Sequence, residues 1–208
     1  MIKPKRSYHI TTNSPHRFRK HRNLIENVTP NRPEEHWVSD MTYIGTRNNP
    51  VYLALITDAY SKKIVGYDVF NSLGLNSSLK ALKRAIKFKK YPDETLIHHS
   101  NRGLQYCSYA YQEKLSKHAI LCSITQGSDP YTNAVAVRVN GVLKQEFIID
   151  KFGRTLKEKT ELVKDAIKKY NTLRPHYSCY YLTPEEMHNQ SCIKIRTYKK
   201  SGVKKLFS

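Results

Sequence analysis

The sequence has no long apolar run and few acidic residues. None of its apolar stretches reaches the roughly 18 residues that a membrane-spanning helix needs. The basic N-terminus is not followed by an apolar stretch, so we expect no secretory signal and no membrane partner. With 17 Asp and Glu against 36 Lys and Arg, the formal net charge is +19. Because so large a charge favours a polyanionic partner, nucleic acid is the first candidate, and a generally basic soluble protein is the alternative.

Cysteine is scarce, and its spacing argues against the common zinc and disulfide patterns. The four cysteines contain no C-x-x-C pair; they are Cys107, Cys122, Cys179 and Cys192. Such a pattern is typical of reduced thiols in a cytoplasmic protein. We therefore expect a cytoplasmic location.

The positive charge is concentrated at the two ends. Residues 1–32 hold eight Lys or Arg against one acid, and Lys3, Lys5 and Arg6 open this segment. Residues 191–208 hold six Lys or Arg and no acid. Basic arms of this kind contact phosphates without reading sequence, although solvated tails have the same composition. We divide the 208 residues into an N-terminal arm (1–32), one domain (33–190) and a basic tail (191–208).

Hydrophobic periodicity between the arms predicts alternating strands and helices. Three short strands on tight turns are expected first, as an antiparallel meander at 36–46, 51–57 and 63–70. Strands at 95–99 and 120–124 are then expected to alternate with helices at 75–90, 109–118, 133–147 and 155–174, before a short helix that opens at Thr183. This order predicts an α/β fold with a mixed sheet flanked by helices.

Asp40 lies inside the first predicted strand, between apolar neighbours. An acid is unusual there, and its simplest explanation is a polar residue on an edge strand. However, DNA phosphoryl transfer is commonly carried out with two metal ions held by carboxylates at strand ends. Mg²⁺ prefers such oxygen ligands, so Asp40 is the candidate metal ligand.

Four motifs in order carry a family resemblance. They are Trp37–Ile44, His98–Tyr106, Asn133–Phe147, and Tyr170-Asn171 followed by Arg174-Pro175-His176. From about residue 5 to about residue 188 the chain resembles bacterial insertion-sequence transposases with a retroviral-integrase-like catalytic core. The resemblance implies a ribonuclease-H-like five-stranded mixed sheet, transposition by cleavage and joining of DNA strands, and Mg²⁺ as cofactor. It also implies self-association in a DNA complex, and a helical DNA-end-recognising region that precedes the core or sits on a companion helix-turn-helix chain.

The resemblance also implies an Asp-Asp-Glu catalytic triad, whose spacing this chain keeps and whose residues it changes. Asp40 stands at the first position, Asn101 at the second and Val137 at the third, with 35 residues between the last two. Thr132 is a further departure from the family pattern. Losing one preorganised electrostatic group typically costs a factor of roughly 10²–10³ in rate, so we expect catalysis to be impaired. A non-catalytic DNA-binding or assembly protein on the same core is the alternative.

Three other acids are candidates for rescuing the site. Asp58 ends the second predicted strand and Asp129 precedes the helix that carries Val137. Glu146 lies nine residues beyond Val137, so it should point elsewhere. We expect none of the three to replace the missing ligands.

The resemblance assigns DNA contacts to Arg102, Arg138 and Lys144; a solvated surface is the alternative for them. His98 and His99 are expected to be structural strand-end residues rather than metal ligands. The remaining expectations are that Arg174 and His176 brace the last helices and that Trp37 belongs to the core.

Overall fold

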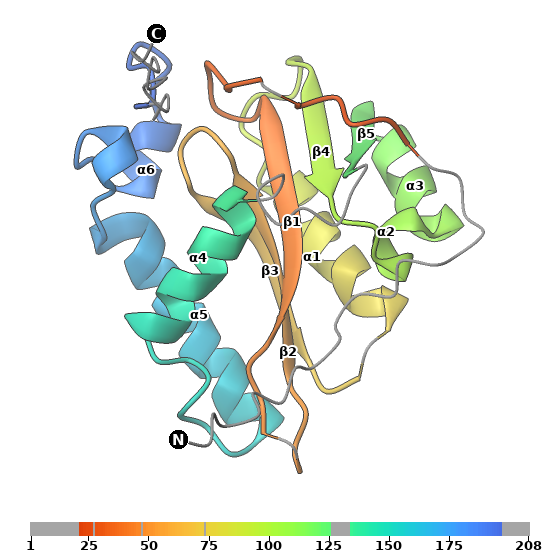
Figure 1. The fold of residues 1–208 in the computed structure, drawn as a ribbon, viewed down its shortest axis with the longest axis vertical. Helices are drawn as coiled ribbons and strands as arrows, with labels where there is room; N and C mark the ends of the chain where they lie inside the picture. Colours follow the sequence, from red (N-terminus) through yellow and green to blue (C-terminus); the bar gives the residue numbers. More distant parts are fainter. Residues whose placement is uncertain (1–20, 27, 47, 73, 126–133, 197–208) are drawn as a thin grey trace, which may run out of the picture.

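The computed structural model describes residues 21–26, 28–46, 48–72, 74–125 and 134–196, and these form a five-stranded mixed sheet with helices on both faces (Figure 1). The sheet order is β3-β2-β1-β4-β5. Its strands are β1 (His36–Tyr43), β2 (Tyr52–Asp58), β3 (Ile64–Phe70), β4 (Leu96–Ser100) and β5 (Ile120–Ile124). The first three strands are antiparallel, whereas β4 and β5 run parallel to β1. The predicted meander and mixed sheet are confirmed.

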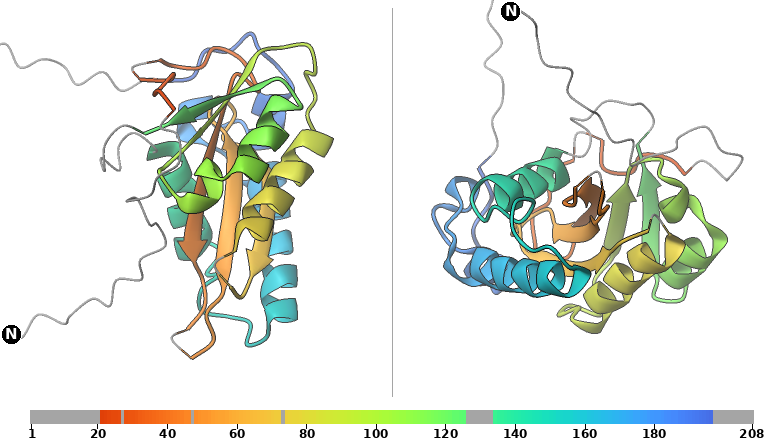
Figure 2. Two further views of the ribbon diagram at one scale, coloured as in Figure 1. Left: turned by 90° about the vertical axis from the view of Figure 1, so that its right-hand side faces the viewer. Right: turned by 90° about the horizontal axis from the view of Figure 1, so that it is seen from below.

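Helices cover the sheet in two layers, as the view from below shows (Figure 2). One layer holds α1 (Leu75–Lys87), α2 (Leu104–Cys107) and α3 (Tyr109–Ser116), and the other holds α4 (Ala134–Gln145) and α5 (Leu156–Leu173). A short helix, α6 (Pro184–His188), follows α5. Because strand side chains alternate in direction, β2 sends Ala54 and Ile56 into the core under α1 and Leu53 and Leu55 into the core under α4 and α5.

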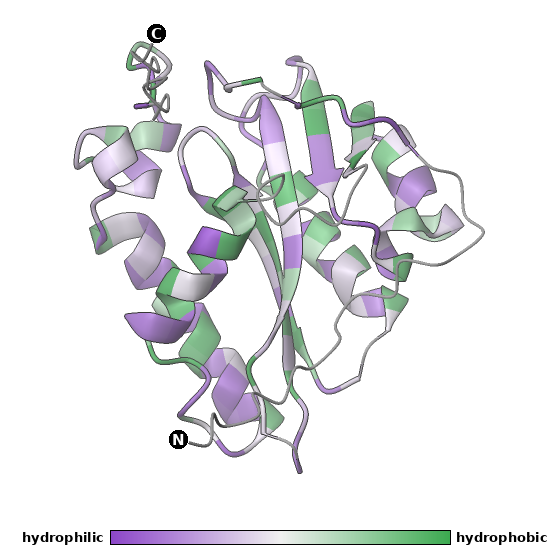
Figure 3. Ribbon diagram, viewed as in Figure 1, coloured by the Kyte–Doolittle hydropathy of each residue, from purple (hydrophilic) through white to green (hydrophobic). Residues whose placement is uncertain are grey.

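Apolar burial on both faces explains why β2 is an almost continuous apolar run (Figure 3). Trp37 is fully buried, as expected, in the core that α1 and α3 cover. Capping boxes at Thr155–Glu158 and Thr183–Glu186 begin α5 and α6. These two helix starts agree with the sequence prediction.

Three details differ from the prediction. β1 ends at Tyr43 instead of residue 46, because a tight turn closed by a Thr46–Asn49 bridge begins there. The turn needs Gly45, since a Cβ at that position would lie 2.3 Å from the Val51 nitrogen. α1 ends at Lys87, and the single-turn helix α2 was not expected.

Both basic end segments begin to pack where the structure describes them. The Ile124 N–H donates to the Arg22 carbonyl and the Leu24 N–H donates to Ser123 Oγ, so this part of the N-terminal segment runs beside β5. At the other end, Tyr60 donates its hydroxyl to the Ile193 carbonyl. Lys3, Lys5 and Arg6 lie outside the described residues. Among the helices described, none is long and apolar enough to cross a membrane.

Candidate functional site

Asp40, in the middle of β1, lies beside Asn101, which directly follows the parallel strand β4. β1 and β4 pair with Ser39 opposite Ser100. The residue after Ser39 is Asp40 and the residue after Ser100 is Asn101, so these two lie next to each other. The Asn101 amide nitrogen lies 3.4 Å from Asp40 Oδ1, and its carbonyl oxygen accepts a hydrogen bond from the Gly103 N–H at 3.0 Å. This pairing brings together the first two positions of the triad that the resemblance implies.

α4 crosses the sheet at the same place and contributes a residue that the sequence analysis missed. Asn140 is buried and donates its amide N–H to Asp40 Oδ2 at 2.8 Å. Val137 lies three residues earlier, on the same side of the helix, with 48% of its side chain exposed. Helical spacing from Val137 was the signal for Asn140, because a residue one turn away faces the same strand.

Burial raises the pKa of Asp40 to about 6, although hydrogen bonds from the Met41 backbone and Asn140 and the charge of Lys144 oppose the rise. Burial also lowers the pKa of Lys144, against the attraction of Asp150 and Asp40. Lys144 is half-buried, and its charge acts on the Asp40 carboxylate. Arg138, in contrast, is exposed on α4.

The residues at this site do not fit a Mg²⁺ centre. Mg²⁺ needs oxygen ligands, preferably carboxylates, and here Asp40 alone carries a negative charge. Both of its oxygens face amide N–H donors, whereas Val137 offers no ligand atom. Within the described ranges there is no group of three or more His, Cys, Asp or Glu that could hold a metal ion.

The candidate replacement acids are engaged elsewhere. Asp58 pairs across the sheet with Trp37, and its oxygens accept from the Glu34 N–H and from the N–H and hydroxyl of Ser61, all within 2.7 Å. Glu146 forms a bidentate ion pair with Arg174, in which both nitrogen–oxygen distances are 2.6 Å. Asp129 and Thr132 lie outside the described residues.

Comparisons with known proteins agree with this architecture. Two family models, each described as an integrase core domain, match the chain over residues 30–130 and 118–184. The insertion element IS600 uncharacterized 31 kDa protein of Shigella sonnei is 32% identical over 184 residues, which cover 88% of this chain and 67% of that protein. The chain belongs to the integrase-core family of insertion-sequence transposases.

Other relatives are matched over smaller shares of their length. The transposase for insertion sequence element IS629 of Shigella sonnei is 38% identical over 117 residues, or 56% of this chain and 39% of the relative. The transposase for insertion sequence element IS904 of Lactococcus lactis is 33% identical over 166 residues, or 79% of this chain and 65% of the relative. The chain thus spans between about two fifths and two thirds of these proteins.

Solved structures show the same fold. A chain of the simian T-cell lymphotropic virus intasome, solved with a PP2A regulatory subunit, aligns with a TM-score of 0.66 at 18% identity, covering 91% of this chain and 66% of that one. The HTLV-2 integrase catalytic core domain in complex with magnesium gives 0.59 at 18% identity, covering 80% and 99%. The fold is ribonuclease-H-like.

The histidine pair of the transposase motif is structural. His98 is fully buried, with Nε2 2.6 Å from Ser39 Oγ and 3.0 Å from the Tyr111 hydroxyl. His99 Nδ1 lies 2.8 Å from Ser123 Oγ. Burial lowers the pKa of His98 to about 3 and that of His99 to about 4, so both rings stay neutral. These contacts join β1, β4, β5 and α3.

The remaining signature residues connect α5 to its neighbours. Asn171 uses both ends of its amide on edge strand β3, accepting from the Ile64 N–H at 2.9 Å and donating to the Ile64 carbonyl at 3.0 Å. Arg174 joins α5 to Glu146 after α4, and its guanidinium lies 3.1 Å from His176 Nε2. Arg174 and His176 therefore brace the helices, as the sequence analysis expected.

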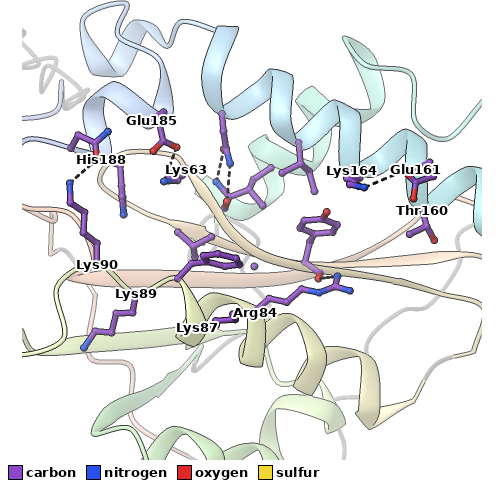
Figure 4. A pocket seen from close by; sticks show the side chains of 18 residues that line it. Lys63, Arg84, Lys87, Lys89, Lys90, Thr160, Glu161, Lys164, Glu185 and His188 are labelled. Atoms are coloured by element: carbon purple, nitrogen blue, oxygen red, sulfur yellow. Dashed lines mark hydrogen bonds and ion pairs between the residues drawn. The ribbon is translucent and has the colours of Figure 1, made fainter.

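A basic hollow lies beside β3, between α1, α5 and α6 (Figure 4). Three of its cations form ion pairs with nearby acids. Lys63 binds Glu185 at 2.7 Å, Arg84 binds Asp68 at 3.3 Å and Lys164 lies 3.4 Å from Glu161. Since none of the three triad positions lines it, this hollow is separate from the Asp40 site.

The Arg102 side chain is partly committed to the fold. It is half-buried and donates from Nε to the Thr125 carbonyl at 3.0 Å. This contact holds the loop after β4 against the end of β5. Of the three cations that the resemblance assigned to DNA, only Arg138 is fully at the surface.

Proposed function

We propose that this chain is a transposase core that binds DNA and lacks metal-dependent strand transfer. The family membership and the net charge of +19 support the DNA partner. The impairment is supported by one observation above all. The Asp40 carboxylate faces amide groups of Asn101 and Asn140 where a metal site needs further acids.

The physical argument is electrostatic. Two metals in a phosphoryl-transfer site stabilise the attacking and leaving oxygens, and carboxylates must first offset the charge of the metals. Asp40 alone supplies a single negative charge, and amide N–H groups of Asn101 and Asn140 already face both of its oxygens. Asp40, Asn101 and Val137 therefore keep the positions of a catalytic triad while only Asp40 keeps the acid.

Cations around the site support phosphate binding. Arg138 is exposed on α4, Arg102 lies in the loop after Asn101, and the charge of half-buried Lys144 acts on Asp40. Lys3, Lys5 and Arg6 add charge from the N-terminal arm. We assign the contacts to DNA phosphates, which supply affinity without sequence reading. Self-association on DNA, a companion helix-turn-helix chain and a bacterial cytoplasmic location complete the proposal.

Restoring the acids tests the proposal. The double variant Asn101→Asp with Val137→Glu is compared with the wild type by Mg²⁺ calorimetry and by cleavage of DNA carrying insertion-sequence ends. We expect no measurable Mg²⁺ binding by the wild type and clear binding by the double variant. The metal-free melting temperature of the double variant should be lower, because three clustered carboxylates repel one another.

A matched control moves only the second added acid away from the site. Asn101→Asp with Leu121→Glu places that acid on β5, at a residue that is 49% exposed against 48% for Val137. Because this control still pairs Asn101→Asp with Asp40, it should bind Mg²⁺ more weakly than the Asn101→Asp, Val137→Glu variant and support no DNA cleavage. Tight Mg²⁺ binding or strand cleavage by the wild-type chain would contradict the impairment, and failure to bind DNA at low salt would contradict the DNA partner.

A further inference from the structure

Three tyrosine side chains stand at the surface in the loop between α5 and α6. Tyr177, Tyr180 and Tyr181 are 48%, 47% and 65% exposed. The rings of Tyr177 and Tyr181 meet edge to face, with centroids 5.6 Å apart. Because aromatic side chains gain much from burial, a cluster left in solvent marks a contact surface.

The backbone of this loop holds the tyrosines in a strained conformation. Tyr180 has φ 55° and Tyr181 has φ 66°, a left-handed region that bulky residues rarely adopt. Two hydrogen bonds fix the loop, from the Tyr181 N–H to the His176 carbonyl at 2.9 Å and from the His176 N–H to the Leu182 carbonyl at 3.0 Å. Strain of this kind persists where the surroundings enforce it and is common at binding sites.

A cation completes the cluster. The Arg196 guanidinium lies 4.4 Å from the ring centroid of Tyr177 and 4.3 Å from that of Tyr180. The acids of nearby α6 have other partners. Glu185 binds Lys63 at 2.7 Å, and Glu186 accepts from the Thr183 hydroxyl at 2.8 Å.

The loop also adjoins the helix that carries Val137. Arg174, three residues before Tyr177, pairs with Glu146 just beyond α4, and the charge of Arg138 on α4 helps to lower the pKa of His176, after burial, Arg174 and Lys62. The loop that carries the tyrosines is thus anchored, through Arg174, to the end of the helix on which we place DNA contacts. An aromatic surface that includes an arginine suits nucleic acid, because every base has a face that stacks and arginine attracts the phosphates.

We propose that Tyr177, Tyr180, Tyr181 and Arg196 form a stacking platform for unpaired bases of a DNA strand held by the core. The inference rests on the proposed DNA function and adds a preference for unpaired over paired DNA at this loop. Stacking is tolerant of sequence, so the platform accepts any base.

The test uses the full chain, a short single-stranded oligonucleotide that contains 2-aminopurine, and the corresponding duplex. Stacking on tyrosine should quench the 2-aminopurine fluorescence. We expect Tyr181→Ala to weaken single-strand binding about tenfold and to reduce the quenching, while duplex affinity is unchanged. Tyr181→Phe keeps the ring and should behave as the wild type.

Two further variants keep the test decisive. Phe152→Ala removes an aromatic side chain that is 60% exposed in the loop before α5, and it should change neither affinity. Tyr180→Gly removes a ring where glycine tolerates the observed φ, so it should weaken single-strand binding without lowering the melting temperature.

The failures of the two proposals can be told apart. Unchanged quenching and affinity in Tyr181→Ala, with duplex binding intact, would overturn the platform alone. A Tyr181→Ala variant that alters only self-association in sedimentation would overturn it in favour of a protein contact. If the wild-type chain binds neither the single-stranded oligonucleotide nor the duplex at low salt, both the platform and the proposed function are overturned.

Discussion

At the scale of single residues, the Asp40 carboxylate lies among neutral and basic groups rather than other acids. Two amides face it, and the charge of half-buried Lys144 acts on it. Burial disfavours its charged form, so the pKa rises to about 6 despite these contacts. The amides stabilise the charge only in part, and the carboxylate keeps a proton at pH values where an ordinary Asp has lost it.

The pH dependence of stability follows from that shift. The folded-state pKa is raised above the ordinary value, so the folded protein binds more protons than the unfolded one between about pH 4 and pH 6. The contribution of Asp40 to the free energy of unfolding therefore falls as pH rises through this window, by about 2–3 kcal/mol in total. Carbon NMR should give a pKa near 6 for Asp40.

Asn140→Ala should raise the pKa of Asp40 further, because it removes the amide N–H that stabilises the carboxylate. Asn76→Ala, on an exposed position of α1, is the matched control and should leave the titration unchanged. A pKa near the ordinary value of 3.8 in the wild type would contradict the predicted burial of the charge.

At the scale of elements, His188 ties α6 to the sheet. It ends α6, and its ring lies 3.4 Å from Glu34 Oε1, 3.8 Å from Asp58 Oδ1 and 3.0 Å from Ser61 Oγ. Glu34 in turn accepts from the N–H groups of the α1–β4 connection. Ser61, His188 and Asp58 resemble a nucleophilic triad in composition, but all three are fully buried, so the cluster is a structural junction.

The charge of His188 should stabilise this junction in a pH-dependent way. Burial lowers the pKa of His188, but hydrogen bonds to Asp58 and Glu34 raise it above the ordinary value overall, whereas nearby Lys63 opposes the rise. A raised histidine pKa adds stability that is full below about pH 6.5 and is lost as pH rises through the folded value. His188→Gln should cost about 3 kcal/mol at pH 6, since it leaves two buried carboxylates without a cation, and less at pH 9.

Chemical denaturation at the two pH values measures the effect. His118→Gln replaces an exposed histidine after α3 and should change stability by less than about 0.5 kcal/mol at both pH values. An equal cost of His188→Gln at pH 6 and pH 9 would show that the ring acts by packing alone.

The sequence predicted the elements better than the site. The periodicity of apolar residues located all five strands, and the helix starts expected at 155 and at Thr183 agree with α5 and α6 to within one residue. Asn140 stands one helical turn from Val137, which is the signal the sequence offers, but its bond to Asp40 depends on how α4 packs against β1, and the sequence pattern does not give that packing. The His188 junction escaped the prediction for the same reason, since its members come from four separate segments.

At the scale of the whole molecule, the excess of positive charge is concentrated in the two end segments, and part of the N-terminal segment packs on the core. Residues 22–24 run beside β5, and Pro30, Pro33 and Glu34 are buried, so the segment from residue 21 onward belongs with the core. Deleting all of residues 1–32 would therefore damage packing as well as charge. Residues 1–20 carry six Lys or Arg, so a truncation that ends there removes charge and spares the contacts of residues 22–34.

Removing residues 1–20 should weaken the salt dependence of duplex DNA binding. For each phosphate contact that is lost, the slope of log affinity against log salt should become shallower by about 0.9, because fewer counterions are released on binding. Removing residues 197–208, which carry four Lys, provides a comparison at the other end of the chain. Fluorescence anisotropy over a salt series measures the slopes, and the melting temperature of each truncated chain verifies that the core is intact. If both truncations leave the slope of the full chain unchanged, the phosphate contacts belong to the core, and charge reversals at Arg138 and Lys144 should then flatten it.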